Sequence, residues 1–122
     1  MKRIKIKAGD VEVKAELKET PLAEKIFNSL PFSSKVNTWG DEIYFEIPVD
    51  TEIKNGVKEV EKGDIAYWPA GKCMCLFFGP TPISHSGKII PASEVEVFGK
   101  IVEGMEKLKE VSVGEEIVVE KE

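Results

Sequence analysis

The feature that most constrains this chain is an alternation of charged and apolar residues near its start. Between residues 2 and 8, Ile4 and Ile6 share one parity, and basic side chains occupy the other. Gly9-Asp10 then forms a typical turn dipeptide, and residues 11–17 resume the alternation. Successive side chains of a β-strand point to opposite faces of a sheet. The pattern therefore predicts a β-hairpin with one buried face.

A change of period after residue 19 predicts a helix. Thr20 is a suitable N-cap, and Pro21 suits the first helical position, where its missing N–H breaks no hydrogen bond. Pro31 is expected to end this helix. A second, shorter helical pattern covers residues 102–111. The apolar stripe of the first helix contains Leu22, Ile26, Phe27 and Leu30.

The rest of the chain consists of short apolar stretches separated by turn residues. Residues 73–78 are almost wholly apolar, which is typical of a strand buried on both faces. Residues 79–93 are rich in proline, glycine and serine, so a long irregular loop is expected there. The strands predicted after the hairpin cover residues 43–47, 57–60, 65–68, 73–78, 95–98 and 117–119.

These elements amount to about eight strands and two helices. We therefore expect a mostly β fold, namely a closed eight-stranded antiparallel β-barrel with two capping helices. Closure would also remove the strand edges on which sheets aggregate. At 122 residues the chain forms a single domain, expected to cover residues 1–122.

Composition argues against several classes of partner. The net charge is −5, whereas nucleic-acid binding needs clustered positive charge, so we expect no nucleic-acid partner. The longest apolar run is residues 73–78, too short for a membrane helix, and no apolar signal stretch follows Lys2-Arg3. A cytoplasmic location is therefore expected. The chain lacks glutamine and is rich in Glu and Lys, a composition similar to that of proteins from thermophiles.

Three segments together resemble the cyclophilin family of peptidyl-prolyl cis–trans isomerases. The first is Glu16-Leu17 followed by the Pro-initiated helix, and the second runs from Gly63 to Phe77-Phe78. The third, Val97-Phe98-Gly99-Lys100 with Glu103-Gly104-Met105, is the most specific. Their order and spacing agree over residues 11–119. The chain is most similar to small prokaryotic cyclophilin-like proteins of unassigned function, and the resemblance implies a barrel of the cyclophilin type.

The residues that cyclophilins use for catalysis are largely missing here. In that family an arginine on a strand stabilises the twisted prolyl amide, whose nitrogen has become an acceptor, and a glutamine assists it. The corresponding strand, residues 43–47, contains no basic residue, and the only arginine, Arg3, lies on the first predicted strand. Val95 occupies the place of the family's histidine, and Leu76 that of a second glutamine. We therefore assign no catalytic residue and expect little or no isomerase activity.

Five residues are candidates for a ligand-binding groove on such a barrel. Alternation places Tyr44 and Glu46 on one face of their strand, while Trp68 stands where the family has a small residue and narrows the groove. Phe78 matches an aromatic residue of the family's pocket, and His85 lies in the loop that approaches it. The candidate groove therefore comprises Tyr44, Glu46, Trp68, Phe78 and His85. A solvated His85 and a surface Glu46 remain alternative interpretations.

The function predicted from these observations is binding of a proline-containing peptide or a small molecule. A weak or atypical prolyl isomerase is one alternative, and an enzyme of unrelated chemistry on the same barrel is another, because a fold does not fix a function. Cys73 and Cys75 point to the same face of a strand and are interpreted as small buried side chains. With His85 they still make an incomplete zinc site, so we expect no metal and no cofactor.

Overall fold

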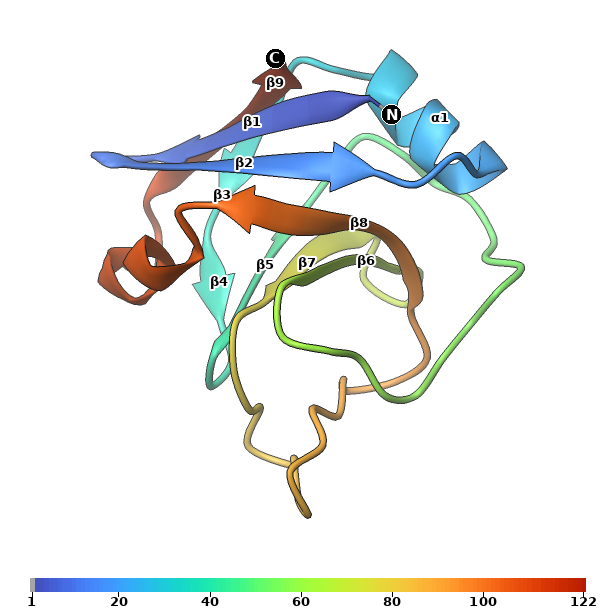
Figure 1. The fold of residues 1–122 in the computed structure, drawn as a ribbon. Helices are drawn as coiled ribbons and strands as arrows, with labels where there is room; N and C mark the ends of the chain where they lie inside the picture. Colours follow the sequence, from blue (N-terminus) through green and yellow to red (C-terminus); the bar gives the residue numbers. More distant parts are fainter. Residues whose placement is uncertain (1) are drawn as a thin grey trace.

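The computed structural model of the chain describes residues 2–122. In these residues nine strands form one antiparallel sheet in the order β3-β9-β1-β2-β8-β6-β7-β5-β4 (Figure 1). The first half contains β1 (Arg3–Ala8), β2 (Val11–Leu17), α1 (Pro21–Asn28), β3 (Phe32–Lys35), β4 (Asn37–Thr38) and β5 (Glu42–Glu46). The second half contains β6 (Asp64–Trp68), β7 (Cys73–Phe77), β8 (Glu96–Glu103), the 3₁₀ helix η1 (Met105–Glu110) and β9 (Glu116–Lys121).

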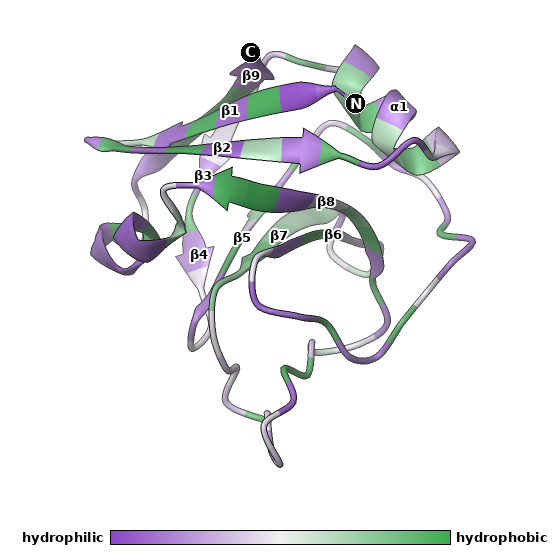
Figure 2. Ribbon diagram, in the orientation of Figure 1, coloured by the Kyte–Doolittle hydropathy of each residue, from purple (hydrophilic) through white to green (hydrophobic). Residues whose placement is uncertain are grey.

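The predicted N-terminal hairpin is confirmed. Strands β1 and β2 are antiparallel with Ile6 opposite Val13, and Gly9 takes a φ of 58° in the turn between them. The alternation along β1 is visible as changes between hydrophilic and hydrophobic colour in Figure 2. Strand β1 also pairs with β9, where Ile6 lies opposite Val119. The alternating apolar residues of this region thus form one wall of the core.

The sheet curls into a nearly closed barrel, with nine strands where eight and full closure were expected. Seven of the eight predicted strands form, and residues 32–38, where none was predicted, add β3 and β4, which separate at Val36. The Val36 amide donates to the carbonyl of Glu115 at 2.9 Å, so β3 stays beside β9, whereas β4 pairs with β5. A single residue therefore joins the two ends of the sheet.

The predicted strand at residues 57–60 does not form. That segment makes only isolated bridges, Val57 to Val95 and Val60 to Ile89. Just before it, the amides of Lys54 and Asn55 donate to the buried carboxylate of Glu96 at 2.9 and 3.2 Å. The backbone there is satisfied by a side chain and by single bridges, so no ladder develops.

Helix α1 has the predicted start. The Thr20 hydroxyl accepts a hydrogen bond from the Ala23 amide at 3.2 Å, and Pro21 is the first helical residue. Leu22, Ala23 and Ile26 are buried. The second predicted helix is shorter than expected, because β8 continues through Glu103 and leaves only a 3₁₀ segment after Gly104. Among residues 2–122, no helix is long and apolar enough to cross a membrane.

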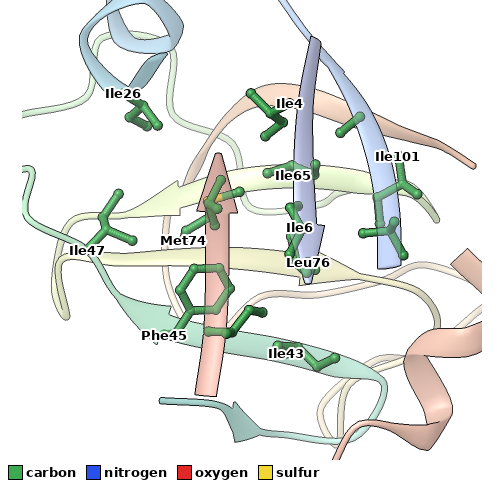
Figure 3. Close-up of a cluster of buried hydrophobic side chains, with 14 of the residues drawn as sticks. Ile4, Ile6, Ile26, Ile43, Phe45, Ile47, Ile65, Met74, Leu76 and Ile101 are labelled. Atoms are coloured by element: carbon green, nitrogen blue, oxygen red, sulfur yellow. The ribbon is translucent and has the colours of Figure 1, made fainter. Parts of the chain in front are cut away.

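The central strands are buried on both faces, as predicted for residues 73–78. All five residues of β7 are buried. Figure 3 shows Met74 and Leu76 among Phe45, Ile65 and Ile6 in the barrel interior. The opposite face of the same strands carries a second apolar cluster, made of Val60, Ala66, Cys73, Cys75, Phe77, Ile89 and Val95. The outer face of β7 and part of that of β6 are thus covered rather than solvated.

Gly104 should be among the least replaceable residues of the fold. Its φ is 89°, and a Cβ added to it would lie 2.6 Å from the backbone oxygen of Glu12. Gly114 has the same φ but open space around it, so it is a matched control. We expect Gly114→Ala to lower the free energy of unfolding by about 1 kcal/mol, from backbone strain alone. Gly104→Ala should lower the free energy of unfolding by at least about 2 kcal/mol, because the backbone at Glu12 must also move to make room for the new Cβ. If chemical denaturation showed the same loss of free energy of unfolding for both variants, the close contact between Gly104 and Glu12 would be contradicted.

Candidate functional site

The site lies on the outer face of β5, β6 and β7, opposite the barrel core. Because side chains alternate, Glu42, Tyr44 and Glu46 share this face of β5. Tyr44 pairs with Cys75 of β7, and Glu42 pairs with Phe77. The strand ladder therefore places a carboxyl group and a phenol directly beside the second apolar cluster.

A pocket of about 220 Å³ opens on this face. Two loops complete its walls. A turn in which the Trp39 amide donates to the Glu42 carbonyl at 2.9 Å brings Trp39 to one side. The segment before β8 approaches from the other side, where the Trp68 indole N–H donates to the Ser93 hydroxyl. The residues lining the pocket are Trp39, Glu42, Tyr44, Trp68, Pro91, Ala92 and Val95.

Aromatic rings form much of this pocket. The rings of Tyr44 and Trp68 meet edge to face, with centroids 6.2 Å apart and planes at 82°. Trp39 adds a third ring from the turn before β5. All three side chains are partly exposed, whereas Glu42, which lines the same pocket, is 5% exposed. The pocket thus has accessible aromatic walls and a buried acid.

Glu42 is the most perturbed carboxyl group described in the chain. Burial raises its pKa to about 7, and a hydrogen bond with the Cys75 thiol opposes that rise in part. Within residues 2–122, no Lys, Arg or His pairs with its carboxylate. Burying an ionised carboxylate without a counter-ion costs free energy, so burial favours the neutral, protonated form of Glu42. Near neutral pH this group can hold or release a proton.

The two cysteines are structural neighbours of the site. Burial raises the pKa of the Cys73 thiol to about 11, and raises that of Cys75 well above its ordinary value. The charge of Glu42 raises both further. Both are free thiols. Among the described residues, no group of three or more His, Cys, Asp and Glu side chains could hold a metal ion.

The structure brings two of the five candidate groove residues together. Tyr44 and Trp68 line the pocket. Glu46 is exposed on the same face of β5 but does not line it, and His85 is exposed in the loop after β7, beside Ser86. Phe78 is 7% exposed and belongs to the barrel core, whereas Phe77 belongs to the outer cluster.

Glu42 is a pocket residue that the sequence analysis missed. The alternation that placed Tyr44 and Glu46 on one face extends two residues back to Glu42, so the signal was present. Trp39, Pro91 and Ala92 had no such signal. They reach the pocket through loops whose course the local pattern does not specify.

The only guanidinium of the chain lies elsewhere. Arg3 Nε donates to Glu122 Oε1 at 2.7 Å, and its Nη1 lies 3.3 Å from Glu16 Oε2. Arg3 belongs to β1, where its side chain pairs with the carboxylates of Glu16 and Glu122, and it does not line the pocket. The residues lining the pocket therefore include one carboxyl group and no cationic side chain.

Folding should be most favourable when Glu42 is protonated. Its pKa in the folded chain lies above the ordinary value of 4.5, so the folded state binds more protons between these values. The free energy of unfolding should therefore fall as pH rises from about 5 to about 8, by at most about 3 kcal/mol. Glu42→Gln should remove this decline in pH-dependent urea unfolding. Glu46→Gln, an exposed control on the same strand face, should retain it. A decline that persists in Glu42→Gln would contradict the assignment.

The cysteines should resist alkylation while the chain is folded. Both thiols are buried and their pKa values are raised, so little thiolate forms at about pH 8. Iodoacetamide followed by mass spectrometry should modify neither residue in the native protein and both in urea. Rapid labelling of Cys75 in the native state would contradict its burial in the second apolar cluster.

Comparison with known proteins agrees with the fold. The Cyclophilin-like family model matches residues 2–120. The solution structure of the hypothetical protein AF2241 from Archaeoglobus fulgidus is 47% identical, with a TM-score of 0.86, covering 99% of this chain and 95% of that one.

A more distant structure, McbB in complex with tryptophan, has a TM-score of 0.75 at 18% identity and shows the fold alone. That alignment covers 98% of this chain and 44% of McbB. No curated protein matches the sequence. Given a family match over nearly its whole length, the chain belongs to the cyclophilin-like family.

Proposed function

We propose that this cyclophilin-like domain binds a small organic molecule in the pocket around Glu42. The observation that carries the proposal is the arrangement of three accessible aromatic side chains around one buried carboxyl group. Ligand sites are typically concave and mostly apolar, with a few polar groups that fix orientation. A buried group with a strongly raised pKa in such a cavity is a further mark of a functional site.

The size of the pocket supports a small ligand. Its volume is about 220 Å³, whereas sites for drug-sized ligands span roughly 300–1,000 Å³. A compact molecule fits this space, and so does a single side chain of a peptide, including one that contains proline. A free small molecule is our preferred ligand, because the walls enclose one compact space rather than an extended groove.

The chemistry of the pocket does not favour prolyl isomerisation. Rotation about the prolyl amide makes its nitrogen an acceptor, which a preorganised donor must stabilise in the transition state. Glu42 is an acceptor when ionised, and Val95 offers no polar atom. We propose that the domain keeps the binding face of the cyclophilin-like barrel without the isomerase chemistry.

An enzyme of different chemistry is the second candidate, and one observation favours it. A general acid or base works best when its pKa lies near the working pH. Burial holds the pKa of Glu42 at about 7. A bound substrate with an exchangeable proton next to this carboxyl could therefore undergo proton transfer.

The proposal is tested by a fragment screen that uses the tryptophans as reporters. The chain has two tryptophans, Trp39 and Trp68, and both line the pocket. Fragments that bind should change the intrinsic fluorescence and shift the backbone amide signals of Tyr44 and Val95 in NMR spectra. Fragments that bind only at other surfaces would contradict the proposal.

Isomerase activity should be low. In a protease-coupled assay with a proline peptide, we expect a rate enhancement at least about a hundredfold below that of a cyclophilin with its arginine, because one lost donor costs that much. The assay should also be run at elevated temperature, because the composition of the chain is similar to that of proteins from thermophiles. A rate comparable to that of a cyclophilin would overturn the binding-only interpretation.

A further inference from the structure

We propose that the pocket binds an alkylammonium head group, and specifically an N-methylated one. This inference rests on the proposed function, since it names the class of ligand for the same pocket. It follows from the charge, the aromatic walls and the hydrogen-bonding capacity of the residues that line the pocket.

The charge of the pocket favours a cation. Glu42 is the only carboxyl group among the lining residues, which include no basic side chain, and no basic side chain of residues 2–122 pairs with it. Removing an ionised carboxylate from water is costly unless an opposite charge accompanies it. A bound cation would supply that charge, whereas an anionic ligand would meet repulsion.

The aromatic walls favour the same class of ligand. The faces of tryptophan and tyrosine rings attract cations within about 6 Å of the ring centroid, and tryptophan does so most strongly. Tyr44 and Trp68 stand nearly perpendicular, with planes at 82°, and therefore present two walls at a right angle. Trp39 supplies a third wall. Walls of this kind around a carboxylate can surround a compact cation on several sides.

The hydrogen-bonding capacity of the walls favours N-methylation. A primary ammonium has three N–H donors and needs three acceptors. Among the lining side chains only Glu42 and Tyr44 carry acceptor oxygens, and Pro91, Ala92 and Val95 are apolar. A quaternary ammonium donates no hydrogen bonds, and its methyl groups can pack against rings and apolar walls.

Such a head group occurs on free small molecules and on methylated lysine side chains. The experiment therefore compares three probes at about pH 8, where Glu42 is ionised: choline, its neutral isostere 3,3-dimethylbutan-1-ol, and a short peptide containing trimethyllysine. Intrinsic tryptophan fluorescence and isothermal titration calorimetry report binding. The proteins are the unaltered chain, Glu42→Gln, and the control Glu46→Gln, whose altered residue is exposed outside the pocket.

We expect the unaltered chain and Glu46→Gln to bind choline at least about tenfold more tightly than the neutral isostere, a difference of about 1.4 kcal/mol. Glu42→Gln should lose most of this preference. Its circular dichroism spectrum and unfolding midpoint verify that it folds, and loss of the unfavourable buried charge should make it no less stable at this pH. Tighter binding of the peptide than of choline would identify a protein side chain as the source.

Two results would overturn the inference. If the isostere binds as tightly as choline, the pocket is a ligand site without preference for charge, and the proposed function stands. If neither ammonium probe binds while fragments from the screen do, the head-group assignment fails by itself. If fragments also fail to reach the pocket, the proposed function fails with it.

Discussion

The structure depends on the burial of its central strands on two faces. Every residue of β7 is buried, with Met74 and Leu76 facing the barrel core and Cys73, Cys75 and Phe77 facing a second apolar cluster. Because side chains of a strand alternate, the same backbone contributes to the barrel core and to the second apolar cluster beside the pocket. The hydrogen bonds of β7 to β5 and β6 thus fix the position of Glu42 relative to Trp68.

This arrangement buries the carboxyl group of Glu42, which disfavours its ionised form. A carboxyl group at this strand position would cost little if water reached it. Here the turn that carries Trp39 and the segment at residues 91–95 line the pocket beside it, and Glu42 is 5% exposed. Its carboxyl retains the Cys75 thiol as a weak partner. Functional sites commonly keep such a locally unfavourable group because ligand binding requires it. The fold of the cyclophilin-like family is present here, and the pocket on the outer face of β5 is lined by an acid and by no basic side chain.

Local sequence patterns predicted the elements whose formation is a local matter. The alternation around Gly9-Asp10 gave the hairpin, and Thr20-Pro21 gave the start of α1. The strand expected at residues 57–60 failed because the carboxylate of Glu96, distant in sequence, satisfies the backbone just before it. The division at Val36 likewise depends on the loop at Glu115.

The candidate site was predictable only in part, for related reasons. Alternation along β5 was sufficient to place Tyr44, and by extension Glu42, on the outer face. In residues 73–78 every side chain is apolar, so parity could not tell which phenylalanine faces inward, and Phe78 proved to be the core residue. Trp39 and Pro91 reach the pocket through turns, and a periodic pattern says nothing about where turns meet.

The bridge between Val57 and Val95 joins the pocket wall to the long segment between β5 and β6. Val57 N donates to Val95 O at 2.7 Å, and Val95 N donates back at 3.0 Å. Val95 forms part of the pocket wall, while Val57 belongs to the long segment between β5 and β6. Because two backbone hydrogen bonds join Val57 to Val95, a displacement of the pocket wall at Val95 would have to move Val57 as well or break that pair.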